Sequence, residues 1–496
     1  MRRSTFLIAI VAILIGRGIA LSAETRLLPA YPQFSEPAAR LTVQDVPPGD
    51  QLDTRDSPTE LQNDRGQQDR TDDRDEKGRA ADRIAFRPGF TSDPQDPVVE
   101  LKRIRQKREL ADKDDIALFR TSPLTPLRKR SIECEKRIYE ATNIKLGTAL
   151  NTLLQGLTNE IPGNRNVGMS SFVTFIGTWD GWRKKCADRA ELTLGVEGRW
   201  NYGTTDPTTL GNIALGSLGF TANPFTTYSP TFIVRNLFWR QGSREAGWMY
   251  RVGRVTPDQF LNTSLHINPL STYLPIVGTG AFAMGLPDSG LGLFAGIFVS
   301  DNVNVVGVVS DANANRFTFG DIGEGDLFTA FEIQAKLLPF TENAGYSKVT
   351  FWHNDGTANG LPINGSTGAE GWGVFIKLEQ ELTCDGRAIA IGRWGRSYKD
   401  SALYEQQAAG HLVVYDPFHS GRFKRMGFDA DLFGIAYNWC QPTATIRGES
   451  NVELFYRFPL FPEMDATLSY QAVIHPALNP DSDYGSALSL RLRSTW

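Results

Sequence analysis

The 496-residue chain has little cysteine and little histidine, with 4 and 5 residues respectively. Cys134, Cys186, Cys384 and Cys440 are widely spaced, and none belongs to a C-x-x-C pair. Because structural zinc sites need clustered cysteines or histidines, this spacing excludes the usual zinc modules. No metal site is predicted from these residues.

Catalytic signatures are missing as well. The sequence has no G-x-S-x-G, H-E-x-x-H or P-loop lysine motif, and its histidines lack an obvious nucleophile or carboxylate partner. A loose dinucleotide pattern at Gly290–Ala295 is followed by the valine-rich Val303–Val309 and not by a helix, so glycines in a curved strand explain it better. Asp321–Asp326 lacks the spacing of a known calcium loop. We therefore expect the protein to be no enzyme and to bind no cofactor.

An excess of one charge sign is also absent, since 52 basic and 56 acidic residues give a net charge of −4. This balance does not indicate a nucleic-acid partner. Long apolar runs are absent after the N-terminus. Arg2 and Arg3 precede the apolar stretch Phe6–Ile15, which is about half the length that a membrane span needs. Residues 1–23 are therefore predicted to be a signal peptide.

Residues 24–135 are predicted to form a mostly disordered, partly helical extension. Asp50–Asp82 is dense in Asp, Arg, Gln and Gly, and such a composition cannot bury enough surface to fold. Val98–Phe119 has a helix-forming composition, and Pro123 and Pro126 are expected to end any helix there. The extension is interpreted as a solvated periplasmic linker, with a contact to the cell wall or to a partner protein as the alternative.

What the sequence does contain is strict alternation, most clearly in Glu449–Trp496. Leu488, Leu490 and Leu492 share one face of a predicted strand, while Arg491 and Arg493 lie on the other. Turn residues separate the segments, and the chain stops on an aromatic residue at a strand end. In a transmembrane barrel, one strand face meets lipid, the other meets the lumen, and aromatic residues lie at the interface.

The same alternation continues from Ala141 onward, in segments joined by Gly, Asn, Asp and Pro clusters. Counting them gives about sixteen strands, an even number as bacterial barrels have. The predicted fold is therefore all-β: a transmembrane antiparallel β-barrel over residues 141–496.

The closing stretch resembles the carbohydrate-selective porins of the OprB type, from bacterial outer membranes. Those proteins have an E-x-x-Y-R-F segment, an N-P-containing loop and a G-L-R-L-x-F-like last strand. The resemblance extends back to about Ala141. It is carried by Glu453, Tyr456, Arg457, Phe458, His475, Pro476, Asn479, Pro480, Leu490, Arg491, Leu492 and Trp496.

Counting strands back from a periplasmic C-terminus makes most of the short turns periplasmic and most of the long connections external. The longest connection, Val255–Ser289, is expected to fold into the lumen and narrow it, as the porin resemblance suggests; a surface lid is the alternative. Cys134 and Cys186 would lie near each other on the periplasmic rim. We leave open whether they form a disulfide or remain free thiols.

The polar face of each strand gives a predicted lumen lining with both charge signs. Mixed charge with aromatic residues suits neutral polyols, whereas a large excess of one sign would indicate ion selectivity. For each charged residue taken singly, we favour a role in holding the shape of the wall by ion pairs across the lumen over direct contact with the substrate. The predicted lining comprises Glu197, Arg199, Arg235, Glu332, Lys336, Lys377, Glu379, Arg396, Glu453, Arg457, Arg491 and Arg493, with Trp239, Trp352 and Trp394.

In the family, arginines and acidic residues at the constriction select sugars. The resemblance transfers a substrate-lining role to Glu197, Arg199, Arg254, Arg393, Trp394 and Arg396. Strand parity argues against Arg254, which follows Val252, and against Arg393, which shares its face with Ile389 and Ile391.

The sequence thus predicts an outer-membrane channel of a Gram-negative bacterium for passive diffusion of carbohydrates, surrounded by lipid. The alternatives are a general or anion-preferring porin and a structural tether of the envelope. The identity of the sugar and the presence of homo-oligomers stay open.

Overall fold

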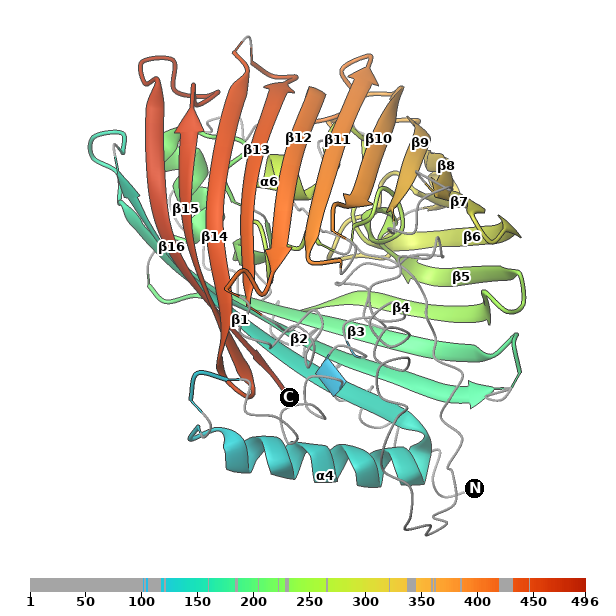
Figure 1. Ribbon diagram of the computed structural model, residues 1–496. Coiled ribbons are helices and arrows are strands. Elements are labelled where there is room, and N and C mark those ends of the chain that lie inside the picture. The colour runs from blue at the N-terminus through green and yellow to red at the C-terminus, as the bar shows by residue number, and fades with distance from the viewer. Residues whose placement is uncertain are drawn as a thin grey trace, which may run out of the picture. The chain divides into compact units, whose positions relative to one another are not determined.

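The structure is a computed structural model in which sixteen antiparallel strands form one closed barrel (Figure 1), as the sequence predicts. Each strand pairs with its neighbours in the chain, and β1 closes on β16, where Leu154 lies opposite Leu490. The structure describes residues 101, 104–105, 117–119 and 122–496, apart from gaps at 159, 183–185, 204, 222, 228–231, 265, 321, 337–344, 358–359, 361–362, 384–385, 419–430 and 446.

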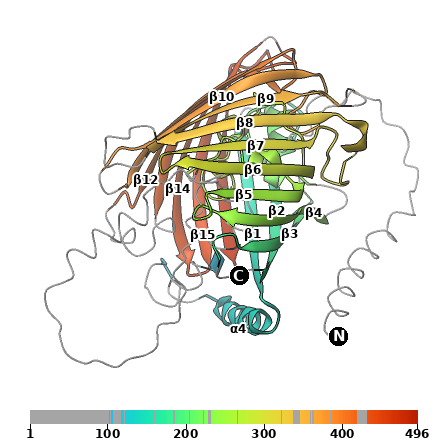
Figure 2. The same ribbon diagram turned by 90° about the vertical axis from the view of Figure 1, so that its right-hand side faces the viewer.

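The strands are 8 to 16 residues long and lie side by side around the wall (Figure 2). They are β1 Ile144–Thr158, β2 Val167–Trp182, β3 Ala190–Asn201, β4 Phe232–Ser243, β5 Trp248–Val255, β6 Gly290–Ser300, β7 Val303–Asp311, β8 Leu327–Lys336, β9 Gly345–Asn354, β10 Gly371–Glu381, β11 Ala388–Tyr398, β12 Tyr404–Tyr415, β13 Leu432–Pro442, β14 Glu449–Phe461, β15 Met464–Ile474 and β16 Tyr484–Thr495. The helical elements are α4 Thr125–Thr142, α5 Pro207–Leu210, α6 Ile276–Thr279, η1 Gly211–Leu215, η2 Asn223–Phe225, η3 Pro257–Gln259 and η4 Ile322–Glu324.

Burial alternates along the strands because one face lines the filled lumen and the other faces outward. On β16, Leu488 is exposed, whereas Ser489 and Arg491 are buried. On β14, Glu453 and Arg457 are buried, and Leu454 between them is exposed. The inward and outward faces predicted for these two strands are therefore confirmed.

The outer face is apolar and carries aromatic pairs near both ends of the barrel. Trp372 stacks on Tyr398 with ring centroids 4.2 Å apart, and Trp248 stacks on Tyr250 at 6.0 Å. The first pair lies at the end with the long connections, which we call the loop end. The second lies at the end where β16 finishes, which we call the C-terminal end. Such aromatic girdles flanking an apolar band are typical of barrels that sit in lipid.

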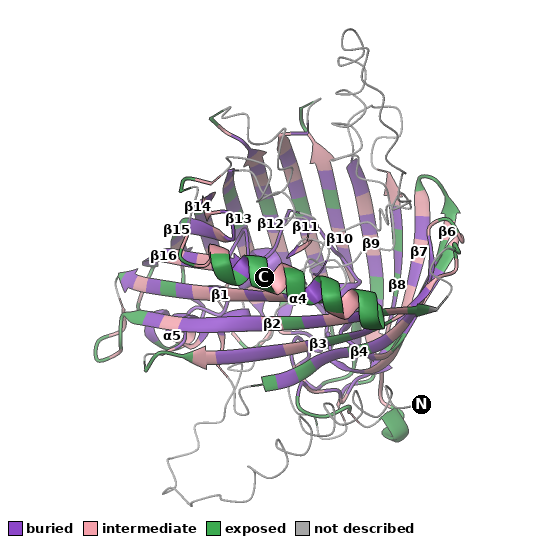
Figure 3. Cartoon of the chain, turned by 90° about the horizontal axis from the view of Figure 1, so that it is seen from below, coloured by how far each residue is buried: buried purple, intermediate pink, exposed green. Residues whose placement is uncertain are grey.

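Helix α4 lies across the C-terminal end of the barrel (Figure 3). Pro126 lies in the first turn of α4, after the segment whose helix it was predicted to end. Proline is tolerated there because the first N–H groups of a helix have no intrahelical partner. No helix in the described part of the chain is long and apolar enough to cross a membrane.

The segment before α4 also contacts the barrel. The backbone N–H groups of Leu118 and Phe119 donate to the carbonyls of Pro459 and Leu460, at 2.9 and 3.0 Å. Leu101 and Ile104 are helical and fully buried. Most of the predicted helix at 98–119, the predicted disordered stretch at 50–82 and the predicted signal peptide lie outside the described residues.

The connection between β5 and β6, residues 256–289, folds into the barrel; we call it the inner loop. Its described residues are buried throughout. Its apolar side chains, among them Phe260, Ile276 and Phe282, form a core with inward residues of β6–β10 such as Phe294 and Trp352. The inner loop therefore fills the lumen with packed side chains, as the prediction of an inward fold requires.

The cysteines contribute no disulfide in the described part of the chain. Cys134 on α4 and Cys186 in the β2–β3 turn are exposed free thiols, and Cys440 on β13 is a buried one. The disulfide considered for Cys134 and Cys186 is thus not formed in this structure. Cys384 lies outside the described residues.

Candidate functional site

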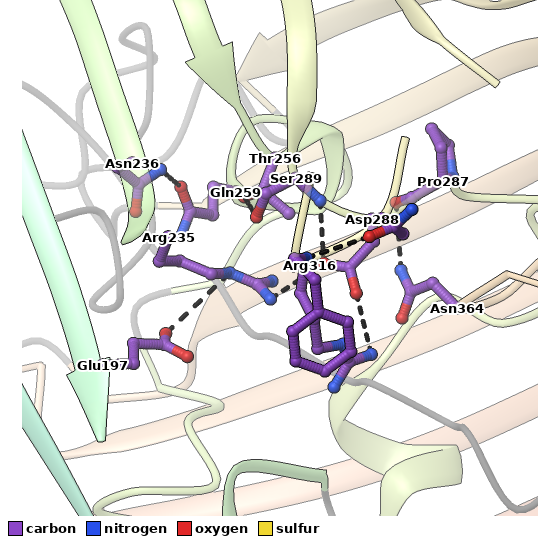
Figure 4. A network of polar contacts seen from close by, with 12 residues as sticks. Glu197, Arg235, Asn236, Thr256, Gln259, Pro287, Asp288, Ser289, Arg316 and Asn364 are labelled. Carbon is purple, nitrogen blue, oxygen red and sulfur yellow. Dashed lines mark hydrogen bonds and ion pairs between the residues drawn. The ribbon is translucent and has the colours of Figure 1, made fainter. Parts of the chain in front are cut away.

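A chain of buried charges lies on the inner wall near the loop end (Figure 4). Arg199 on β3 donates to Glu197 at 2.8 Å, and Arg235 on β4 donates to Asp288 of the inner loop at 2.9 Å. Arg316, from the β7–β8 connection, lies 2.7 Å from the other oxygen of Asp288. Arg235 is also 3.8 Å from Glu197, so it links the strand pair to the inner loop.

A β-bulge brings Arg235 into this chain of charges. Gly195 pairs with Asn236 and Val196 pairs with Val234, so β4 carries one extra residue at this point. Both Arg235 and Asn236 are buried as a result. Bulges of this kind re-aim side chains locally, and here two successive polar residues point inward.

The same bulge changes the parity of the rest of β4. Trp239 pairs with Leu192 and Val252, which are both exposed on the outer face. The sequence-based placement of Trp239 in the lumen is therefore corrected: it faces outward. Alternation counted from Arg235 fails because the extra residue shifts the register by one.

The base of the inner loop is fixed by uncharged contacts around the charge chain. Thr256 and Ser289, at its two ends, hydrogen-bond through their hydroxyls at 2.8 Å. Asn236 donates to Gln259 at 2.9 Å. Asp258, next to Gln259, is buried, and burial raises its pKa from 3.8 to about 8, although Arg235 opposes the shift.

Further along the wall, strand carboxylates receive donors from the inner loop. Glu332 on β8 accepts the backbone N–H of Asn262. Glu379 on β10 accepts the Ser264 hydroxyl at 2.7 Å. Two lysines neutralise these acids from the wall, because Lys377 lies 3.1 Å from Glu379 and Lys348 lies 3.8 Å from Glu332.

On the opposite wall, the inner loop is held near its middle. Glu453 on β14 accepts the backbone N–H of Leu274 at 2.8 Å. Arg491 on β16 donates to the carbonyls of Pro269 and Thr272, at 2.6 and 2.7 Å. The lumenal charges thus act first as clamps on the inner loop, which fits the reading of such residues as wall-holding groups.

The structure brings some of the predicted site residues together and separates others. Glu197 and Arg199 point inward and pair with each other. Arg393 also points inward, although its strand neighbours Ile389 and Ile391 are apolar. These isoleucines are inward too, because they pack on the apolar part of the inner loop, Ile267 and Tyr273 included.

Trp394 and Arg396 lie on the outer face of β11, so their placement in the lumen is corrected. The Arg396 side chain is 43% exposed and lies 3.7 Å from Glu405, beside the Tyr398 ring. The physical reason is the apolar core inside the lumen. The apolar face of β11 packs against this core, so Arg396 is left on the outer face.

Arg254 does not line the lumen either. It follows exposed Val252 and pairs with exposed Leu237, so it points outward from β5. The β7–β8 connection covers it there, and its guanidinium donates to the carbonyls of Asn315, at 3.0 Å, and Thr318. The parity argument against Arg254 was the correct one.

Asp258, Asp288 and Arg316 were missed because they come from connections, where alternation carries no information. The length of the β5–β6 connection was the only signal that pointed to this region. Among the described residues, no group of three or more His, Cys, Asp and Glu side chains could hold a metal ion.

Among known proteins, only solved structures resemble this chain. No family model matches the sequence, and no curated protein matches it. The high-pH structure of Pseudomonas putida OprB aligns over 77% of this chain and 99% of its own, with a TM-score of 0.58 and 12% identity. A triple mutant of Rhodopseudomonas blastica porin aligns over 71% of this chain and 100% of its own, with a TM-score of 0.43 and 10% identity. At this identity the OprB likeness is one of fold, and at that level the predicted resemblance is confirmed.

Proposed function

We propose that the chain is an outer-membrane channel for passive diffusion of neutral carbohydrates. The observation that carries the proposal is the combination of an apolar outer face with an inner wall of paired charges. Exposed leucines such as Leu468 and Leu488 need lipid around them. The paired acids and bases inside leave no large excess of one sign, which suits uncharged solutes better than ions.

Selection in this proposal occurs near the loop end. Glu197, Arg199 and Arg235 carry hydrogen-bond donors and acceptors on adjoining strands, and Arg393 carries donors on β11. Sugar hydroxyls can bond to both guanidinium and carboxylate groups. Passage also requires weak binding, so that the solute leaves. Arg254, Trp394 and Arg396 have no part in this step, because they lie outside the lumen.

The proposal places the C-terminal end in the periplasm of a Gram-negative bacterium, after removal of residues 1–23. Helix α4 and residues 24–135 would then lie in the periplasm, where the extension can contact the cell wall or a partner. The Ser122 hydroxyl donates to Glu463 at 2.6 Å, which supports an attachment between the extension and the barrel.

A general or anion-preferring porin is the second candidate. Three inward arginines, Arg457, Arg491 and Arg493, gather near the C-terminal end of β14 and β16, where Asp465 lies opposite Arg493. This local excess of positive charge would favour anions.

Two measurements on the purified protein separate the candidates. Swelling of proteoliposomes across a sugar series reports sugar passage, and reversal potentials in planar bilayers report ion preference. A sugar channel shows selective swelling with a reversal potential near zero. Strong anion preference with swelling that follows solute size alone would favour the general porin.

A further inference from the structure

The short helix α6 occupies the interior of the barrel (Figure 1). All four of its residues, Ile276–Thr279, are buried, and it packs against β12 and β13. Two wall side chains hold it by its backbone. Arg393 donates to the carbonyl of Gly278 at 2.5 Å, and Gln407 donates to the carbonyl of Gly280 at 2.6 Å and to that of Val277.

Gly278 is the point of closest approach between α6 and the wall. A Cβ atom at this position would collide with the side-chain amide of Asn438 on β13 and would crowd the ring of His411 on β12. A side chain at position 278 therefore requires Asn438 and His411 to shift, or α6 to move away from the wall.

Asn438, beneath Gly278, and the neighbouring Asn451 are two asparagines of the wall with unused hydrogen-bonding capacity. Asn438 on β13 and Asn451 on β14 lie directly opposite each other in the register. Their side chains are 0% and 1% exposed, and none of their four amide nitrogen and oxygen atoms has a hydrogen-bond partner among the described residues. Buried amides are nearly always hydrogen-bonded in proteins. The unbonded amides therefore cost free energy as long as α6 is seated.

The two asparagines differ from the charged wall residues. Glu332, Glu379 and Glu453 each accept a hydrogen bond from the inner loop, whereas Asn438 and Asn451 receive nothing from it. Each amide offers two N–H donors and an acceptor oxygen without a net charge. Water or a hydroxylated solute could satisfy these groups once α6 has moved.

We propose that α6 is a displaceable stopper, and that Asn438, which α6 covers when it is seated, forms a binding site for neutral hydroxylated solutes together with its neighbour Asn451. This inference rests on the proposed function as a sugar channel. Displacement breaks the hydrogen bonds from Arg393 and Gln407 and uncovers the Asn438 amide for the solute. The proposal requires the two positions of α6 to be close enough in free energy for both to be populated.

The first test unseats α6 by Gly278→Val, with Gly410→Val as the matched control. Gly410 lies on the adjoining strand β12, and a Cβ atom there would meet nothing within 4 Å. We expect Gly278→Val to raise glucose-driven swelling of proteoliposomes by about threefold or more, because the seated population falls. Gly410→Val should match the wild type. Equal swelling in all three proteins would overturn the stopper.

Folding of each variant is checked by the heat-dependent migration of barrels in gels. If Gly278→Val does not fold, Gly278→Ala gives the same test with a smaller clash, and the same expected direction. If Gly278→Val conducts ions better than the wild type but neither protein admits glucose, the stopper is supported and the sugar channel is refuted. If glucose enters through the wild type and the Gly278 variants at the same rate, the sugar channel is supported and the stopper is refuted.

The second test concerns the asparagines. In the Gly278→Val background, Asn438→Leu with Asn451→Leu keeps the side-chain size and removes the amides. We expect the glucose concentration that half-blocks the ion current to rise about threefold to tenfold, since hydrogen bonds in a wet pore are individually modest. Asn304→Leu is the control, because Asn304 is also buried with both amide atoms lacking a partner among the described residues, but lies on β7, away from α6. An unchanged block in the double variant would refute the binding site.

Discussion

The guanidinium of Arg199 lies 2.8 Å from the carboxylate of Glu197, two residues earlier on β3, and their side chains are 1% and 6% exposed. Breaking such a buried pair leaves one charge uncompensated. We expect Arg199→Met to lower the free energy of unfolding by about 3–5 kcal/mol. Glu197→Gln combined with Arg199→Met should cost less than Arg199→Met alone. Urea unfolding followed by tryptophan fluorescence measures both, and a double variant less stable than the single one would contradict the pairing.

Sugar selection gives a second prediction for the same strand. Arg199 is buried here, so a sugar reaches its guanidinium only by replacing one of its contacts; losing this donor should then raise the half-blocking sugar concentration about threefold to tenfold. Arg199→Ala is compared with Arg396→Ala, whose side chain lies on the outer face. Current block in planar bilayers should change only for the first. A block altered by Arg396→Ala would argue against the facing of β11.

Adjacent residues on β16 allow the two faces of one strand to be compared. Leu490 faces outward, and Leu490→Arg near the bilayer centre should cost about 2–4 kcal/mol of stability. Arg491 faces inward and holds the inner loop at Pro269 and Thr272. Arg491→Leu should therefore fold and increase current noise, because the loop loses two anchors. An exchange of the two phenotypes would show that the facing is inverted.

Asp258 predicts a dependence of stability on pH. Burial raises its pKa to about 8, so the folded protein holds this proton more tightly than the unfolded chain does. The contribution of this bound proton to the free energy of unfolding is therefore complete below about pH 4. It is lost as pH rises toward 8, by up to about 1.4 kcal/mol per pH unit. Asp258→Asn removes this term, and Arg235, Asp288 and Glu197 are the charged groups around it.

Urea midpoints of wild type and Asp258→Asn, measured between pH 4 and 9, test this. The difference between the two proteins should change steadily up to about pH 8 and then level off. A difference that is constant across this range would show that Asp258 is ionised in the folded protein.

Membrane orientation is tested by cysteine labelling in intact cells, after replacement of the exposed Cys134 and Cys186 by serine. Glu324→Cys lies in the long β7–β8 connection at the loop end, and Asp301→Cys lies in the β6–β7 turn at the C-terminal end. Both positions are exposed. An impermeant thiol reagent should label only Glu324→Cys, and labelling of Asp301→Cys in intact cells would reverse the proposed orientation.

The sequence by itself determined the barrel, because the period-2 alternation of side chains is a local property of each strand. Leu488, Ser489, Leu490 and Arg491 show their faces without knowledge of any neighbour, and the aromatic residues mark the strand ends. The number of strands follows from counting such segments. The shared inward face of Glu197 and Arg199 follows likewise, since residues two apart on one strand point the same way.

Only the tertiary structure decided which side chains meet inside the lumen. Whether Arg393 or Arg396 faces inward depends on the inner loop, whose apolar residues are more than a hundred positions away in the sequence. The facing of Arg235 and Trp239 depends on the bulge, which arises only where β4 pairs with β3. The seat of Gly278 on Asn438 joins residues 160 positions apart. Such contacts are set by packing between distant segments, and the alternation of side chains along one strand does not predict them.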